Sequence, residues 1–158
     1  MEKITRKFLL KDLPDLEKKT PIHFERYFIE GDDGNETRIQ RKGDKFELET
    51  ILNDSGLSRI IEKAYITEEE FNSLKEESSK AIIRDSYLFS KNPKISIKVY
   101  HENFDGLVRA EVDFKDEAEA KSFVPLEWFG EEITNSDLGR DKKLIELSKE
   151  EFLSLLPE

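Results

Sequence analysis

Residues 104–134, FDGLVRAEVDFKDEAEAKSFVPLEWFGEEIT, place a strand, a helix and a turn directly after one another. Apolar and polar residues alternate over 107–114, which is the two-residue period of a half-buried strand. Residues 116–123 follow with a short helical pattern, which has to end before Pro125 because proline cannot continue a helix. This stretch therefore predicts an α+β fold in which strands are separated by short helices.

The two-residue period recurs along most of the chain, and it predicts strands at 2–10, 24–30, 36–41, 44–51, 58–66, 80–89, 94–100 and 107–114. GDDGN at 31–35 and KGD at 42–44 are typical of hairpin turns, because Gly, Asn and Asp tolerate a positive φ. Two further helices are indicated by capping-box spacing, which pairs Thr67 with Glu70 and Ser148 with Glu151. We expect mainly antiparallel strands in a single domain over 1–158.

Composition narrows the classes of function. The chain has 158 residues, of which 39% are charged, and a net charge of −10. This charge disfavours non-specific binding to DNA or to an anionic membrane, since both reward an excess of Lys and Arg. Cysteine is absent, and no apolar run approaches the roughly 20 residues of a membrane span. We expect a soluble cytoplasmic protein, and the sequence leaves a monomer and a homodimer equally open.

Several common catalytic motifs do not occur in the sequence. The two histidines, His23 and His101, have no partner at a spacing typical of a zinc site. A glycine-rich phosphate loop, a GxSxG elbow and a Cys–His nucleophile pair are also missing. A phosphate group would therefore have to be bound by side chains on strands.

Read from end to end, the sequence resembles the CYTH family, also called triphosphate tunnel metalloenzymes. The stretch 104–134 is similar to that family's GL, AEVEF-like strand, EEA…F helix, P-x-W-x-G turn and E-V-T. RKFLL at 6–10, GDKFELE at 43–49 and SGLSR at 55–59 match further family motifs in the family's order. The resemblance implies an eight-stranded antiparallel β-barrel that forms a tunnel, with flanking helices and with alternate residues of every strand lining the interior.

The resemblance also implies a chemistry for that tunnel. In the family, basic side chains hold a linear triphosphate and acidic ones bind divalent cations, usually Mg²⁺ or Mn²⁺. Members hydrolyse inorganic triphosphate, thiamine triphosphate or RNA 5′-triphosphates, and some cyclise ATP. Such phosphoryl transfer depends mainly on positioning the phosphates and neutralising their charge.

The family's opening strand is written ExExK, and here the same positions are Lys3, Thr5 and Lys7. The lysine is kept, whereas both carboxylates are replaced. Glu2 cannot easily substitute for them, because neighbouring side chains of a strand point to opposite faces. The first strand thus keeps a phosphate-binding position and loses its metal-binding ones.

The other tunnel positions change in the same direction. The family's arginine pair matches Arg38 with Gln40, and its Lys-x-Arg matches Ile82 with Arg84. Two acidic pairs are replaced, by Ile61 with Lys63 and by Ser96 with Lys98, while the last is kept as Glu111 and Asp113. Near the carboxyl end, NSDLGRD stands in place of D-x-R-Y and leaves Arg140 out of register. We interpret RDKK at 140–143 as a solvated face or a helix end.

In this register the tunnel has six candidate phosphate-binding residues and only two candidate metal ligands. The phosphate-binding set is Lys3, Lys7, Arg38, Lys63, Arg84 and Lys98, and the metal ligands for Mg²⁺ or Mn²⁺ are Glu111 and Asp113. Two carboxylates surrounded by ammonium groups should bind a divalent cation weakly. An alternative for Glu111 and Asp113 is that they pair with Lys or Arg across the barrel and only neutralise it.

Three hypotheses of function follow, and they leave open whether the protein is an enzyme. The first is a tunnel that binds a triphosphate, a polyphosphate or a nucleotide-type anion, with lost or weakened metal-dependent hydrolysis. The second is a divergent metal-dependent triphosphatase that uses Glu111 and Asp113. The third is a barrel closed by Ile51, Ile61 and Ile82 that binds a protein partner through its acidic exterior. In the first two, the partner is a phosphate-containing small molecule or a polyphosphate, and neither DNA nor a membrane.

Overall fold

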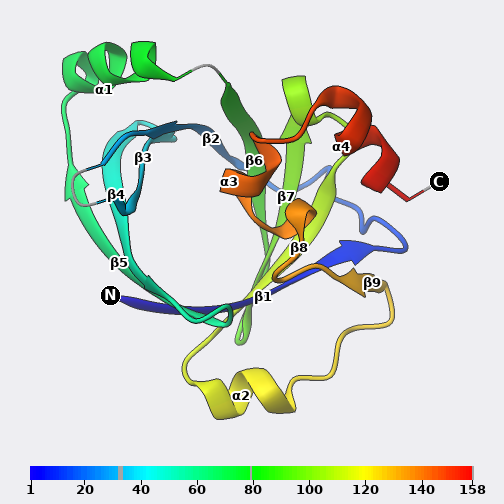
Figure 1. Ribbon diagram of the computed structural model, residues 1–158. Coiled ribbons are helices and arrows are strands. Elements are labelled where there is room, and N and C mark those ends of the chain that lie inside the picture. The colour runs from blue at the N-terminus through cyan, green and yellow to red at the C-terminus, as the bar shows by residue number, and fades with distance from the viewer. Residues whose placement is uncertain (32–33, 79, 158) are drawn as a thin grey trace.

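The computed structural model describes residues 1–31, 34–78 and 80–157, and its centre is a closed antiparallel barrel (Figure 1). The strand order is β5-β4-β3-β2-β6-β7-β8-β1-β9, and pairing of β5 with β1 closes the ring. The strands are β1 (Glu2–Leu10), β2 (Ile22–Ile29), β3 (Glu36–Lys42), β4 (Lys45–Asp54), β5 (Ser58–Tyr65), β6 (Ala81–Lys91), β7 (Lys94–His101), β8 (Val108–Phe114) and β9 (Phe129–Glu132). The predicted α+β barrel is confirmed.

Each strand predicted from the sequence is present, with ends that differ by at most three residues. The hairpin at 42–44 is confirmed, because Lys42 pairs with Lys45 around Gly43, whose φ is +61°. Part of the turn predicted at 31–35 lies outside the described residues. Sequence periodicity missed β9, since the four residues FGEE are too short to show an alternation. This strand pairs with the end of β1 and leads the chain back toward the barrel.

Short helices connect and cover the strands. The helices are α1 (Glu68–Leu74), η2 (Lys75–Glu77), η3 (Glu102–Phe104), α2 (Glu117–Ser122), η4 (Asp137–Gly139), α3 (Asp141–Leu144) and α4 (Lys149–Leu155). Both predicted capping boxes are formed, at Thr67 with Glu70 and at Ser148 with Glu151. Figure 1 shows α1 and α2 on opposite sides of the barrel, with α3 and α4 near the carboxyl end. In the part of the chain that the structure describes, no helix has the length and apolar character needed to cross a bilayer.

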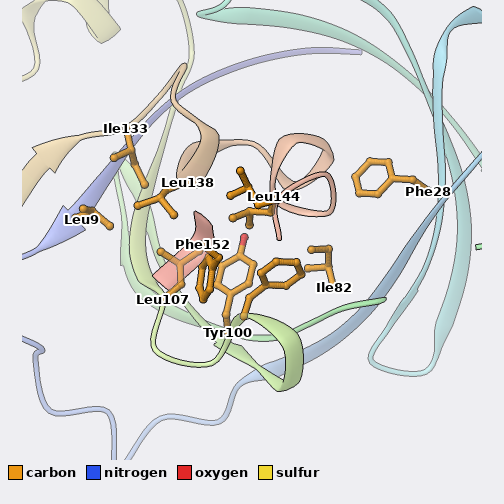
Figure 2. Packing of buried hydrophobic residues seen from close by; sticks show 11 residues of the cluster. Leu9, Phe28, Ile82, Tyr100, Leu107, Ile133, Leu138, Leu144 and Phe152 are labelled. Carbon is orange, nitrogen blue, oxygen red and sulfur yellow. The ribbon is translucent and has the colours of Figure 1, made fainter. Parts of the chain in front are cut away.

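A cluster of apolar side chains covers one end of the barrel. Phe28, Ile82 and Tyr100 project from β2, β6 and β7, and they belong to the same cluster as Leu138 and Leu144 of the carboxyl-terminal segment (Figure 2). The remaining members are Leu9, Phe104, Leu107, Ile133, Leu147 and Phe152. The segment after β9 therefore closes this end by apolar packing, which is the main stabilising force for a small barrel.

The carboxyl-terminal cluster makes a stability prediction. Phe152 is 2% exposed and packs edge to face on Phe104, with ring centroids 5.2 Å apart. Phe152→Ala should lower the free energy of unfolding by about 3–5 kcal/mol, because the truncation leaves a cavity. Urea unfolding followed by circular dichroism measures the loss.

Leu153 offers a matched control, since it is the next residue and is 52% exposed. Leu153→Ala should change stability by no more than about 0.5 kcal/mol. Equal losses in the two variants would show that α4 is not docked through Phe152.

Candidate functional site

The first strand turns its odd-numbered side chains into the barrel. Lys3, Thr5 and Lys7 all line interior cavities, whereas Glu2 on the other face accepts a hydrogen bond from the Ser58 hydroxyl at 2.6 Å. Thr5 Oγ1 donates to Asp113 Oδ1 at 2.9 Å. The orientation expected for this strand is therefore confirmed, and Glu2 does not replace the missing interior carboxylates.

The barrel interior contains two cavities that share part of their walls. The wide cavity has a volume of about 400 Å³ and reaches the surface beside Ile22 and Leu88, which are 46% and 42% exposed. The narrow cavity, of about 40 Å³, lies toward Arg59 and Arg140. The residues common to both are Lys3, Arg26, Arg38, Arg84 and Glu111. The interior is thus not filled, although Ile82 packs into the apolar end as the closed-barrel hypothesis expected.

All eight candidate residues from the sequence face this interior. The wide cavity is lined by Lys3, Arg38, Lys63, Arg84, Lys98, Glu111 and Asp113, while Lys7 lines the narrow one. Lys7 Nζ donates to the Gly139 carbonyl at 2.8 Å, and Lys63 Nζ lies 3.4 and 3.5 Å from carboxylate oxygens of Glu47 and Glu49. The structure therefore brings the predicted residues together, and two of the lysines, Lys7 and Lys63, contact oxygen atoms of the protein itself.

One buried carboxylate organises the arginines between the apolar end and the cavities. Asp141 Oδ2 accepts from Arg26 at 2.8 Å and from Arg84 at 2.6 Å. Its Oδ1 accepts from the Tyr100 hydroxyl at 2.6 Å and from Arg109 at 3.2 Å. We call these five residues the Asp141 cluster. Because both oxygens accept two bonds each, the cluster meets the condition under which a buried charge is tolerated.

The charge balance of the Asp141 cluster sets its protonation. Burial raises the pKa of Asp141, but the neighbouring guanidinium groups of Arg84, Arg109 and Arg26 hold it well below its usual range. Burial lowers the pKa of Arg84, yet Asp141, Tyr100 and Glu111 together outweigh this and raise it overall. The carboxylate and the arginines are therefore all charged at neutral pH.

RDKK at 140–143 lies at a helix end, as one of the two interpretations expected, because Arg140 is the N-cap residue of α3. The other interpretation, a solvated face, is wrong for its first two residues. Asp141 is 5% exposed, and Arg140 donates to Asp54 Oδ2 at 2.5 Å and to the Gly56 carbonyl at 2.9 Å. Only Lys142 and Lys143 of this run are solvent-exposed. The sequence pattern did not reveal the buried residues because α3 is only one turn long. A helix this short has no repeating apolar positions that would identify its buried face.

Sequence reasoning also missed buried charges on three strands. Arg26 on β2, Arg109 on β8, and Glu47 with Glu49 on β4 all point inward. The expected balance of six basic to two acidic residues is therefore wrong, because more of both signs are present. The signal existed for Arg109, which is two residues from Glu111 and so shares its face of the strand.

The acidic residues of the interior are already bonded to cations or hydroxyls. Arg109 donates to Glu111 Oε2 from two nitrogens, at 3.1 and 3.2 Å, and Arg38 donates to Glu49 at 2.9 Å. Burial raises the pKa of Glu111, but the positive charges of Lys98, Arg109 and Lys7 together have the larger effect, and the pKa is held well below its usual range. Glu111 pairs with an arginine of its own strand and not, as expected, across the barrel.

These pairings do not fit a divalent cation. Within residues 1–31, 34–78 and 80–157, no group of three or more His, Cys, Asp or Glu side chains is arranged to hold a metal ion. Magnesium requires oxygen ligands in near-octahedral geometry, and here the oxygens of Glu111 face guanidinium and ammonium groups instead. The interior is therefore built around fixed organic cations.

Several interior cations retain capacity to bind an anion. Arg84 Nε is buried and has no hydrogen-bond partner among the described residues. Burial, together with Arg84, Lys3 and Arg26, lowers the pKa of Lys98 to about 7, although Glu111 acts in the opposite direction. Burial is the main cause of this shift and the neighbouring cations add to it, so the charged form of Lys98 is stabilised less here than it is in water. An anion in the wide cavity would relieve that cost.

Comparisons with known proteins agree with the barrel. No protein-family model matches the chain. The chain is 28% identical over 147 residues to an inorganic triphosphatase of Nitrosomonas europaea, and the match covers 91% of this chain and 97% of that protein. A solved structure of an inorganic triphosphatase superposes with a TM-score of 0.66 at 23% identity, covering 89% of this chain and 95% of the other. A Pyrococcus horikoshii protein covers 98% of this chain and 99% of its own, with a TM-score of 0.56 and 13% identity.

The Asp141 cluster predicts a large loss on truncation. Asp141→Ala should destabilise the fold by about 3–5 kcal/mol, because it leaves buried guanidinium groups without their carboxylate. Asp137→Ala is the control, since Asp137 is exposed and lies only four residues away. Urea unfolding at pH 7 measures both, and a loss below about 1 kcal/mol for Asp141→Ala would contradict the assigned role of the cluster.

Glu49 predicts how stability depends on pH. Burial raises its pKa, but Arg38, Arg26 and Lys63 lower it more, to about 2. The folded state therefore binds this proton more weakly than the unfolded chain, whose glutamates titrate near pH 4.3. The stabilisation is complete above about pH 5 and is lost as the pH falls toward 2.

The matched comparison for Glu49 is Glu49→Gln, which keeps the shape and removes the charge. The wild-type protein should be more stable than the variant by on the order of 2–3 kcal/mol at pH 7, and this gap should narrow as the pH falls from 5 to 3. Urea titrations across that range test it, and a constant gap would contradict the prediction.

Proposed function

The chain belongs to the CYTH, or triphosphate tunnel, family, and from this premise we propose that its barrel binds a linear anion of the triphosphate or polyphosphate type. We further propose that binding does not need a divalent cation and that metal-dependent hydrolysis is weak. The observation that carries the proposal is the buried Arg84 Nε, which has no hydrogen-bond partner among the described residues and belongs to a wall of the wide cavity.

The phosphate contacts would come from five side chains around the wide cavity, which are Lys3, Arg26, Arg38, Arg84 and Lys98. Arginine suits phosphate oxygens because its planar fork donates two parallel hydrogen bonds. The guanidinium groups are pre-positioned, since Arg26 and Arg84 are fixed by Asp141 and Arg38 by Glu49. An anion would then meet donors that need little rearrangement, which lowers the entropic cost of binding.

The charge of the ligand would be neutralised by lysine and arginine instead of by magnesium. Glu111 is bonded to Arg109, and Asp113 to Thr5, so these carboxylates support the wall of the cavity in this proposal. Phosphoryl transfer needs an activated water as well as charge neutralisation. Binding without efficient turnover is the expected consequence.

The alternative is a divergent metal-dependent triphosphatase, and one finding favours it. The relative in Nitrosomonas europaea is an inorganic triphosphatase, and its similarity extends along 91% of this chain. In this alternative Glu111 and Asp113 would hold Mg²⁺ or Mn²⁺, which requires Arg109 to release Glu111. The two proposals differ in how binding responds to metal.

Calorimetry with sodium tripolyphosphate separates the proposals. We expect the dissociation constant for tripolyphosphate to change by less than about threefold, or about 0.7 kcal/mol, when EDTA in the buffer (about 5 mM) is replaced by MgCl₂ at about the same concentration. We also expect phosphate release from tripolyphosphate to be slow in both conditions. An affinity that rises more than about tenfold with magnesium, with turnover abolished by Glu111→Gln, would establish the alternative.

A lysine pair tests the location of the site. Lys3 lines both cavities, whereas Lys11 is exposed just beyond the end of β1. Lys3→Gln should weaken tripolyphosphate binding about tenfold, since a charged hydrogen bond is worth about 1.5–3 kcal/mol, and Lys11→Gln should leave it unchanged. Equal affinities of the two variants would place the anion elsewhere.

A further inference from the structure

Lys98 differs from the other lysines that face the interior. It lies on β7, is 8% exposed and lines the wide cavity. Its Nζ donates to the Ser86 hydroxyl at 2.9 Å and lies 5.1 Å from the centroid of the Phe24 ring. Among the described residues it forms no ion pair with a carboxylate. Its amine is therefore held by one neutral partner in a pocket that a small molecule can enter.

The surroundings of Lys98 favour the neutral amine. Burial, together with Arg84, Lys3 and Arg26, lowers its pKa to about 7, and Glu111 only partly offsets this. Desolvation and nearby cations are the usual means by which a lysine amine is made nucleophilic, because both favour its neutral form. At a pH slightly above 7, a large share of Lys98 would carry a free lone pair.

The neighbouring lysines lack this combination. Lys7 Nζ is bonded to the Gly139 carbonyl and faces the narrow cavity of about 40 Å³. Lys63 Nζ lies between two carboxylates, at 3.4 and 3.5 Å. The charges of Asp113 and Glu111 raise the pKa of Lys3, although burial lowers it more. Lys3 thus shares the wide cavity and a lowered pKa, and Lys98 differs from it in having a hydroxyl, that of Ser86, 2.9 Å from its Nζ.

The cavity around Lys98 presents two kinds of surface to a ligand. Arg26, Arg38 and Arg84 offer guanidinium groups on one side. Ile22, Phe24 and Leu88 form an apolar wall toward the opening. A molecule with a phosphate group at one end and a flat apolar body would match both surfaces. A carbonyl on such a molecule would lie within the cavity that Lys98 lines.

We propose that Lys98 forms a reversible imine with phosphorylated aromatic aldehydes that enter the wide cavity. This proposal rests on the proposed function in one respect, which is that the arginines of the wide cavity bind the phosphate group of the aldehyde. It assigns to this chain a carbonyl-binding activity that is separate from hydrolysis of a triphosphate.

The reaction balances without an oxidant or a metal. The lone pair of Lys98 Nζ attacks the carbonyl carbon, and the C=O π electrons move to oxygen, which takes a proton that the nitrogen releases. The Ser86 hydroxyl, 2.9 Å from Nζ, can relay that proton. The nitrogen lone pair of the resulting carbinolamine then forms the C=N bond, while its hydroxyl leaves with the remaining N–H proton as water. One aldehyde and one amine thus give one imine and one water, and hydrolysis reverses the process.

Pyridoxal 5′-phosphate is the probe, because it carries a phosphate, an aromatic ring and an aldehyde. The full chain is incubated with it at pH 8, reduced with borohydride, digested and mapped by mass spectrometry. We expect Lys98 to be labelled at least about tenfold faster than exposed Lys91, which serves as the internal reference. Pyridoxal, which lacks the phosphate, should label Lys98 about tenfold less, and tripolyphosphate should protect it.

The imine of pyridoxal 5′-phosphate absorbs in the near-visible range, which gives a second measurement. Lys98→Arg keeps a cation but cannot form an imine, so this absorbance should disappear in that variant, whereas the Lys91→Arg variant should retain the absorbance. Labelling of Lys98 no faster than Lys91 in the wild-type protein overturns the proposal, whether or not the variants fold. If calorimetry shows that tripolyphosphate binds the wild-type protein while Lys98 is not preferentially labelled, only the imine proposal fails. If tripolyphosphate does not bind, and pyridoxal and its phosphate label Lys98 equally fast, the arginine site fails as well.

Discussion

The Asp141 carboxylate is the interaction on which the interior of this barrel depends. Guanidinium groups from β2, β6 and β8 and the Tyr100 hydroxyl from β7 all donate to it. Burying these cations without a counter-charge would cost several kcal/mol for each, and Asp141 supplies the carboxylate that all three arginines share. Asp141 comes from the segment after β9, and the carboxyl-terminal chain therefore completes the barrel electrostatically as well as by apolar packing.

The two ends of the barrel interior differ, since one is closed and the other is open. Phe28, Ile82 and Tyr100 close one end against the carboxyl-terminal segment (Figure 2). The Asp141 cluster forms the next layer, and the wide cavity opens at the far side. Positive charge faces a cavity inside a protein whose net charge is −10. Salt screens the acidic surface charges beyond about 8 Å at physiological ionic strength, whereas buried cations act on a ligand in the cavity with little screening. Overall charge therefore says little about the ligand that the interior would accept.

Fixed cations and metal ions are two solutions to the same electrostatic problem. A polyphosphate can be neutralised by lysine and arginine, by a divalent cation held on carboxylates, or by both. Here the carboxylates that could hold a metal instead receive hydrogen bonds from arginine and threonine, as Glu111 and Asp113 illustrate. The same substitution leaves amines, Lys98 above all, in a desolvated cavity where their protonation is weakened. An interior that holds lysines beside bonded carboxylates therefore has the amines that imine chemistry would need.

The sequence by itself determined eight of the nine strands described, and its resemblance to the family implied the barrel and the inward face of each matched strand. The reason is local: a two-residue period and turn residues such as Gly43 specify a strand and its hairpin within a few positions. The resemblance to the family, together with the alternation of strand side chains, also placed Lys3, Lys98 and Glu111 in one interior. Only the tertiary structure decided that Asp141 and Arg140 turn inward, that Arg26 and Arg109 join them, and that one end of the barrel is closed. Those facts depend on contacts between residues far apart in the chain, by 32 positions for Arg109 with Asp141, 86 for Arg140 with Asp54 and 115 for Arg26 with Asp141, and no local periodicity encodes such contacts.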